Sequence, residues 1–254
     1  VNMSVIAQAG AKGRQLHKFG GSSLADVKCY LRVAGIMADY SQPDDMMVVS
    51  AAGSTTNQLI SWLKLSQTDR LSAHQVQQAL RRYQSELISG LLPPEVADGL
   101  IGAFIHDLER LAGLLDSGVN DAVYAEVVGH GEVWSARLMS AVLNQQGLES
   151  AWLDARDFLR AERGAQPQVD EGLSYPLLQQ LLAQHPGKRL VVTGFISRSN
   201  AGETVLLGRN GSDYSATQVG ALAGVSRVTI WSDVAGVYSA DPRKVKDACL
   251  LPLL

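Results

Sequence analysis

The sequence predicts an α/β protein with a mostly parallel sheet covered by helices on both faces. Short runs of β-branched or apolar residues alternate with helical patterns along the chain, which is the order that such sheets require. Several runs end in loops of small residues that lead into a helix, at the strand ends where these sheets bind ligands. Hydrophobic residues make up 46% and charged residues 19% of the 254 residues, which favours a thick interior over disorder.

The first unit is a strand at residues 15–19, a loop at 20–23 and a helix from Leu24. Apolar residues recur at helical spacing from Leu24 to Met37, and Ser41-Gln42-Pro43 ends the helix. Ser23, followed three residues later by Asp26, predicts the N-terminal cap of this helix. The second unit repeats the order, with a strand at 46–50, a loop at 51–57 and a helix at 58–65.

The middle of the chain is predicted to be helical. Residues 68–115 form two helices separated by Pro93-Pro94, which we expect to flank the sheet or to act as a lid. A helix over 122–144, interrupted at 129–131, precedes a short strand at 151–153. A strand at 188–196 then pairs through a turn at 197–202 with residues 204–207. A loop at 208–213, a helix at 214–224 and a strand at 227–231 follow.

Charge and hydropathy exclude several classes of partner. The 22 basic and 25 acidic residues give a net charge of −3, which lacks the positive field of a non-specific nucleic-acid binder. The longest apolar-plus-glycine runs, at 99–105 and 219–225, are far too short for a membrane span, and no signal peptide is evident. The two cysteines lie at opposite ends of the chain, so we expect a cytoplasmic protein without disulfides.

Two loops have the composition of phosphate-binding turns. Lys18 precedes Gly20 and Gly21, whose N–H groups can face a ligand at a helix start, although the order differs from a P-loop. An ordinary turn with an exposed lysine has the same pattern. In the second loop, Arg209 suits bidentate binding of a carboxylate or phosphate beside Asp213. Ser212 and Asp213 are also typical helix caps.

Two further segments have alternative interpretations. Glu132, after Gly131, either receives an ammonium group or lies on a solvated helix face, and taken alone the solvated face is favoured. Residues 231–243 combine aromatic, acidic and basic groups and suit adenine and ribose, or form a surface loop. The five histidines show no metal-ligand spacing, so no metal site is expected, and the absence of G-x-G-x-x-G argues against a nicotinamide dehydrogenase.

Taken in order, these motifs resemble those of aspartate kinases, in particular the aspartokinase portion of bifunctional aspartokinase/homoserine dehydrogenases. The match runs from about Gln15 to the end, and the set is specific although each motif is weak. The motifs are Lys18-Phe19-Gly20-Gly21-Ser22-Ser23, Thr56-Asn57, Gly131-Glu132, Gly194-Phe195, Leu207-Gly208-Arg209-Asn210-Gly211-Ser212-Asp213, Trp231-Ser232-Asp233 to Tyr238, and Asp241-Pro242-Arg243.

The resemblance implies the amino-acid-kinase fold, a three-layer α/β/α sandwich. It implies transfer of the γ-phosphoryl group of ATP, with Mg²⁺, to the side-chain carboxylate of L-aspartate, the first step towards lysine, methionine and threonine. Residues 1–14 would be an N-terminal extension and 15–254 the catalytic domain. The longer protein would be a homo-oligomer.

The resemblance also implies a role for each site residue. Lys18 and Asp213 would be catalytic, and Gly20, Gly21 and Ser22 would bind phosphate. The substrate pocket would contain Ser50, Thr56, Glu132, Phe195, Arg209 and Ser212, with Glu132 at the ammonium and Arg209 at the α-carboxylate. The nucleotide would be held by Ser232, Asp233, Tyr238 and Arg243.

Some positions depart from the family pattern. Serine replaces threonine at Ser22 and Ser232, Asn210 replaces a common glycine, and the loop from Ser50 to Thr56 is one residue short. The family continues past Leu254 into a segment with a nucleotide-contacting lysine, regulatory ACT domains and, in bifunctional enzymes, a dehydrogenase. We therefore expect weak turnover by this chain alone, without inhibition by lysine, threonine or methionine.

Two other functions stay open. The first alternative is a truncated, non-catalytic module that binds nucleotide and amino acid. The second is a related kinase for glutamate, N-acetylglutamate or a nucleoside monophosphate. Glu132 together with Arg209 favours a free zwitterionic amino acid, because an acetylated amine would leave Glu132 without a cation.

Overall fold

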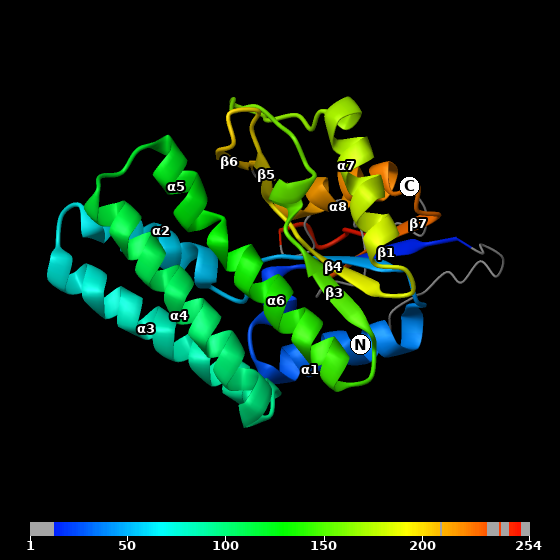
Figure 1. Cartoon of the computed structure of the whole chain (residues 1–254), viewed down its shortest axis with the longest axis horizontal. Helices are drawn as coiled ribbons and strands as arrows, with labels where there is room; N and C mark the ends of the chain where they lie inside the picture. The colour runs from blue at the N-terminus through cyan, green and yellow to red at the C-terminus, as the bar shows by residue number, and fades with distance from the viewer. Residues whose placement is uncertain (1–12, 209, 233–238, 240–243, 250–254) are drawn as a thin grey trace.

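The computed structural model describes residues 13–208, 210–232, 239 and 244–249, which form an α/β domain around a parallel sheet (Figure 1). The five strands of this sheet lie in the order β3-β4-β2-β1-β7, and every neighbouring pair is parallel. They are β1 (Gln15–Phe19), β2 (Met46–Val49), β3 (Ser150–Leu153), β4 (Arg189–Thr193) and β7 (Arg227–Trp231). The predicted parallel sheet is confirmed.

Helices account for most of the remaining described chain. Two short 3₁₀ turns, η1 (Gly21–Leu24) and η2 (Ala155–Asp157), and an antiparallel hairpin of β5 (Ile196–Arg198) and β6 (Thr204–Leu206) complete the elements. The α-helices are α1 (Val27–Tyr40), α2 (Thr55–Ser66), α3 (Arg70–Leu91), α4 (Pro94–Asp116), α5 (Asp121–Val128), α6 (His130–Gln145), α7 (Glu171–Gln184) and α8 (Gly211–Leu222). None of the helices described is both long and apolar enough to span a bilayer.

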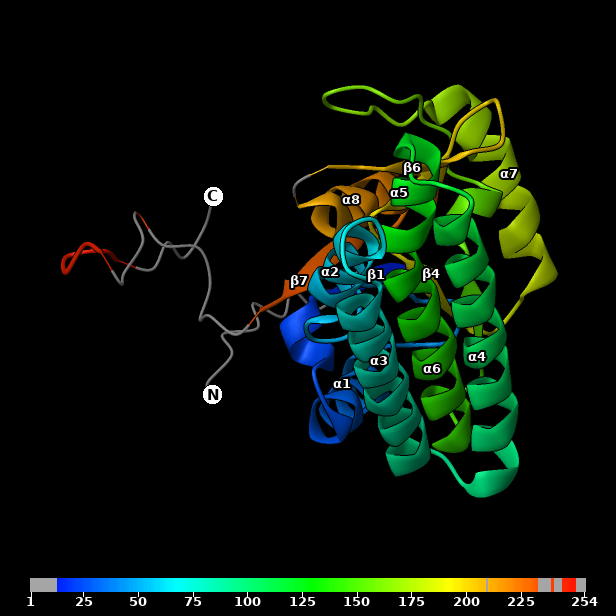
Figure 2. The same cartoon turned by 90° about the vertical axis from the view of Figure 1, so that its left-hand side faces the viewer.

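Each face of the sheet packs against its own core. Met47 and Val49 of β2 belong to the core shared with α1 and α6, whereas Met46 and Val48 belong to the core shared with α7 and α8. This alternation follows from the two-residue period of a strand, and it explains why β2 is apolar at every position. Helices therefore cover both faces, and Figure 2 shows the resulting layers.

The helices α3 and α4 form a flank beside the sheet rather than a lid over the strand ends (Figure 1). They pack antiparallel and meet at Pro93, as the paired prolines predict. The flank is tied to α2 inside the protein, where the Gln84 side-chain amide donates to Thr55 Oγ1 at 3.0 Å. Because α2 starts next to the loop after β2, the flank supports one wall of the strand-end region.

Several local expectations need correction. The predicted strand at 188–196 divides into β4 and β5, and β5 rather than β4 pairs with β6. Helix α8 begins at Gly211, inside the predicted loop at 208–213. Asp26, and not Ser23, caps α1, since its carboxylate accepts from the Cys29 N–H at 2.8 Å and η1 occupies the turn where Ser23 lies. Helix α2 begins at Thr55, three residues earlier than predicted. Helix α7 is absent from the predicted elements, because Pro176 inside it obscures the helical pattern although Asp170 supplies a regular cap.

Candidate functional site

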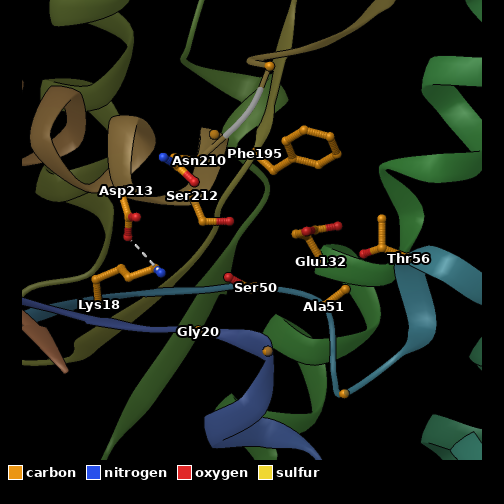
Figure 3. A pocket seen from close by; sticks show the side chains of 14 residues that line it. Lys18, Gly20, Ser50, Ala51, Thr56, Glu132, Phe195, Asn210, Ser212 and Asp213 are labelled. Atoms are coloured by element: carbon orange, nitrogen blue, oxygen red, sulfur yellow. Dashed lines mark ion pairs between the residues drawn. The ribbon is translucent and has the colours of Figure 1, made fainter. Parts of the chain in front are cut away.

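A cavity of about 320 Å³ opens at the carboxyl ends of β1, β2 and β4 (Figure 3). It brings together side chains from segments far apart in the sequence, which a parallel sheet achieves by aligning its strand ends. Nine residues of the predicted site line this cavity: Lys18, Gly20, Gly21, Ser50, Thr56, Glu132, Phe195, Ser212 and Asp213. The other lining residues are Ala51, Gly53, Gly208, Asn210 and Gly211.

Lys18 and Asp213 form an ion pair at one end of the cavity. Lys18 Nζ lies 2.7 Å from Asp213 Oδ1. The lysine is only 9% exposed because it belongs to β1, which lies between β2 and β7 in the sheet. Asp213 stands in the first turn of α8, on the opposite wall (Figure 3). The exposed lysine of an ordinary turn is therefore excluded. The ion pair holds the Lys18 ammonium group at the cavity wall, and the ammonium group has further N–H donors for a ligand.

The glycine loop after β1 lies against the loop after β2. A methyl group at Gly21 would approach the Ala51 carbonyl oxygen to 2.7 Å, and the Gly53 N–H donates to the Gly21 carbonyl at 3.0 Å. Only glycine permits this approach of two backbones. The two loops thus form one continuous floor for the cavity.

The segment after β4 and the loop before α8 have unusual backbone geometry. Phe195 and Asn210 have φ angles of 67° and 56°, in the left-handed region that non-glycine residues seldom adopt. Phe195 is held there because its N–H donates to Ser215 Oγ at 2.9 Å and its carbonyl accepts from the Leu207 N–H. A methyl group at Gly211 would lie 2.5 Å from the Phe195 ring. The helix start of α8 is therefore pressed against Phe195.

Glu132 lies at the other end of the cavity, in the first turn of α6, and is 3% exposed. Burial raises the pKa of this carboxyl to about 8, although N–H groups of Ala51 and of Glu132 itself bind the carboxylate and oppose the rise. Its Oε2 atom has no hydrogen-bond partner, and no ion pair to it occurs among the described residues. The solvated helix face favoured for Glu132 alone is wrong.

Six predicted residues are not among those that line the described cavity. Ser22 is exposed in η1, and Ser232 is exposed just after β7. Four others lie outside the described residues, namely Arg209, Asp233, Tyr238 and Arg243. Five lining residues had no assigned role. Gly208, Asn210 and Gly211 belong to the motif at 207–213, and the small-residue loop after β2 is the signal that points to Ala51 and Gly53.

The described residues include no group of three or more His, Cys, Asp or Glu side chains that could hold a metal ion. Glu132 and Asp213 are the acidic residues of the cavity, and they belong to its two opposite ends (Figure 3). This donor set does not form a resident metal centre.

Residues 13–254 match the model of the amino acid kinase family. The chain belongs to this family. It is 92% identical over 252 residues to Bifunctional aspartokinase/homoserine dehydrogenase 2 of Escherichia coli K12, with 99% of this chain covered. It is 33% identical to the Lysine-sensitive aspartokinase 3 of the same organism, over 91% of the chain. It spans about a third of the length of the first relative and about half of the second, at 31% and 51%.

Solved structures of other proteins have the same fold. E. coli aspartokinase III in complex with aspartate and ADP superposes with a TM-score of 0.84 at 29% identity, covering 94% of this chain and 53% of that one. An isopentenyl phosphate kinase superposes with a TM-score of 0.53 at 19% identity, over 94% of this chain and 79% of its own, which shows a likeness of fold alone. The predicted family and fold class are confirmed.

Proposed function

We propose that this chain is an aspartate kinase domain, which transfers the γ-phosphoryl group of MgATP to the side-chain carboxylate of L-aspartate. The observation that carries the proposal is Glu132, a buried carboxylate aimed into the cavity without a cation among the described residues. The ionised form of a buried carboxyl group requires a cation as partner, and the ammonium group of a free amino acid supplies one. The relatives named aspartokinase, at 92% and 33% identity, support the choice of aspartate.

The amino acid would lie across the cavity from Glu132 towards Lys18. Ser50 and Ser212 lie between these two ends and offer hydroxyl groups to the substrate (Figure 3). Thr56 and Phe195 complete the wall around Glu132. We assign the α-carboxylate to Arg209 from the family resemblance, since a guanidinium binds a carboxylate in bidentate fashion.

Lys18 would stabilise the phosphoryl group during its transfer. A side-chain carboxylate oxygen of aspartate attacks the γ-phosphorus, the bond from phosphorus to the bridging oxygen breaks, and ADP leaves with the electron pair. The reaction needs positioning and charge stabilisation rather than a protein nucleophile. The Lys18 ammonium, held by Asp213, and the N–H groups of Gly20 and Gly21 would stabilise charge on the transferred group. Mg²⁺ would arrive with the nucleotide as part of the substrate.

The nucleotide contacts and the cellular setting extend this proposal. We assign Ser232, Asp233, Tyr238 and Arg243 to the nucleotide, and Ser22 to the phosphates, from the family resemblance alone. We also propose a cytoplasmic location and self-association of the longer protein. These assignments follow the motif order in the sequence.

A coupled ATP-turnover assay with aspartate, glutamate and N-acetylglutamate tests the proposal. We expect turnover with aspartate, much less with glutamate, and none with N-acetylglutamate, whose acetylated amine cannot pair with Glu132. Preference for N-acetylglutamate would contradict the proposal.

Calorimetry, together with the coupled assay, distinguishes the proposed kinase from a non-catalytic binding module. A binding module would bind aspartate and nucleotide without producing ADP in the coupled assay. A longer polypeptide that continues past Leu254 should restore turnover if contacts in that segment are required.

A further inference from the structure

We infer that Glu126, outside the cavity, is a positioning residue that holds the two walls of the acceptor end together. One wall is the start of α6, which carries Glu132, and the other is the β5–β6 hairpin, which begins directly after Phe195. The consequence for aspartate binding rests on the function proposed above. The effect on the two walls does not.

The carboxylate of Glu126 joins five elements of the chain. Its Oε1 atom lies 2.9 Å from Arg110 Nη2 of α4 and 3.6 Å from His130 Nδ1, at the start of α6. Its Oε2 atom accepts from Arg156 Nη1 of η2 at 2.8 Å and from Thr204 Oγ1 of β6. Because Glu126 itself belongs to α5, this single group links the entry of α6 to the hairpin.

The two walls also touch directly beside Glu126. A methyl group at Gly129, between α5 and α6, would lie 2.5 Å from Ile196 Cγ2 and 3.2 Å from Leu206 Cδ2. The hairpin therefore packs against the α5–α6 junction without room for movement towards it. Glu126 adds polar interactions between the same two walls. It binds Thr204 of the hairpin and His130 of α6, which is two residues before Glu132.

The charges around Glu126 keep it ionised. Burial would raise its pKa, but Arg156, the Thr204 hydroxyl, His130 and Arg110 outweigh burial and lower the pKa to about 2. The network extends on both sides. Asp154 pairs with Arg156 at 2.6 Å. Asp107 lies 3.6 Å from His130 Nε2 and pairs with Arg137. At any pH near neutrality, Glu126 therefore accepts charge-assisted hydrogen bonds, which are stronger than neutral ones.

Thr204 offers a matched pair of variants. T204V keeps the shape of the side chain but removes the hydroxyl that donates to Glu126, whereas T204S keeps the hydroxyl. E126Q keeps the size of the glutamate and removes its charge. E203Q serves as a control on the same hairpin, because Glu203 pairs with Arg163 at 3.2 Å at an exposed position away from Glu126.

Hydrogen exchange of the ligand-free chain measures the positioning directly. We expect E126Q and T204V to speed the exchange of backbone amides in residues 129–133 and 195–207, whereas β1 and the rest of α6 keep wild-type rates. T204S and E203Q should behave as wild type. In calorimetry, E126Q and T204V should weaken aspartate binding by about fivefold to twentyfold and leave nucleotide binding within about twofold.

Three outcomes would overturn the inference or the proposed function separately. Unchanged exchange in folded E126Q and T204V, or an increase spread evenly over the chain, would reduce Glu126 to an ordinary stabilising contact and overturn the inference. If E126Q fails to fold, the pair T204V and T204S decides by the same criterion. If the wild-type chain binds no aspartate, the proposed function fails, and the exchange rates still decide the role of Glu126.

Discussion

The two ends of the cavity solve opposite electrostatic problems. At one end, the charge of Lys18 is neutralised by Asp213 at 2.7 Å within the protein itself. At the other end, Glu132 is more deeply buried and has no cation among the described residues. One end is complete without a ligand, and the other becomes complete only when a cation enters.

Under the proposed function, this difference would separate catalysis from recognition. A charge that the fold already holds in place costs no reorganisation when the transition state forms, so it lowers the barrier. An uncompensated buried carboxylate is unfavourable until its partner binds, so it selects the ligand. The contrast predicts that mutations at the two ends change different kinetic constants.

Substitution of Lys18 by alanine should give the largest effect, on kcat. We expect a loss of about 2–4 kcal/mol of barrier stabilisation, or roughly 30-fold to 1,000-fold in kcat, with a small change in KM for aspartate. Steady-state kinetics measure both constants, and K28A on the exposed side of α1 is the control. A folded K18A variant with wild-type kcat would remove Lys18 from the mechanism.

Substitution of Glu132 by alanine should instead weaken aspartate binding. Removal of one partner of a buried charge pair costs about 2–3 kcal/mol, or roughly 30-fold to 150-fold in Kd, and nucleotide binding should be unchanged. Calorimetry measures the two affinities, with E95A at an exposed position of α4 as the control. Equal loss of aspartate and nucleotide affinity would show that Glu132 supports the cavity as a whole.

The pH dependence of aspartate binding sharpens the contrast further. Because the pKa of Glu132 is about 8 without ligand, the carboxyl is largely protonated at neutral pH and must lose its proton to pair with an ammonium group. Affinity should rise by up to about tenfold per pH unit between about pH 6 and 7 and level off above about 8. Calorimetry in two buffers of different ionisation enthalpy should show proton release at pH 7. In E132Q, both effects should disappear.

The same carboxyl predicts a smaller effect on the stability of the ligand-free chain. Its pKa is raised from 4.5 to about 8 by folding, so its contribution to stability is complete below pH 4.5 and is lost as the pH rises through 8. E132Q removes this loss. We expect its Tm to match wild type near about pH 5 and to exceed it by about 4 °C or more near about pH 9, as thermal unfolding measures. A Tm difference independent of pH would contradict the buried carboxyl.

Much of the fold could be predicted because its elements carry local signals. The parallel strands and the paired prolines between α3 and α4 follow from residue patterns that act within a few residues. Helix α7 could not be predicted in this way, because Pro176 lies inside it, where proline normally ends or kinks a helix. The cap at Asp26 could not be predicted either. The turn η1 comes before α1 and delays the start of the helix, and no residue pattern in the sequence indicates this turn.

The site could be predicted as a set of residues but not as an environment. Motif order names nine residues that line one cavity, yet the environment of Glu132 depends on the fold, which packs the start of α6 against Ala51 in the loop after β2. Residues with no motif, such as Glu126 and Thr204, escape sequence reasoning for the same reason. Their importance arises from what the fold brings beside them.

The tight contact between Gly211 and Phe195 has a consequence for mutational tolerance. In a library of all single substitutions selected for growth, position 211 should retain glycine alone, because even one added methyl group would lie 2.5 Å from the Phe195 ring. Gly102 in α4 has nothing within 4 Å of that added carbon and should accept alanine, which favours a helix. Among the surviving variants, glycine would thus be retained at position 211 and replaced freely at position 102.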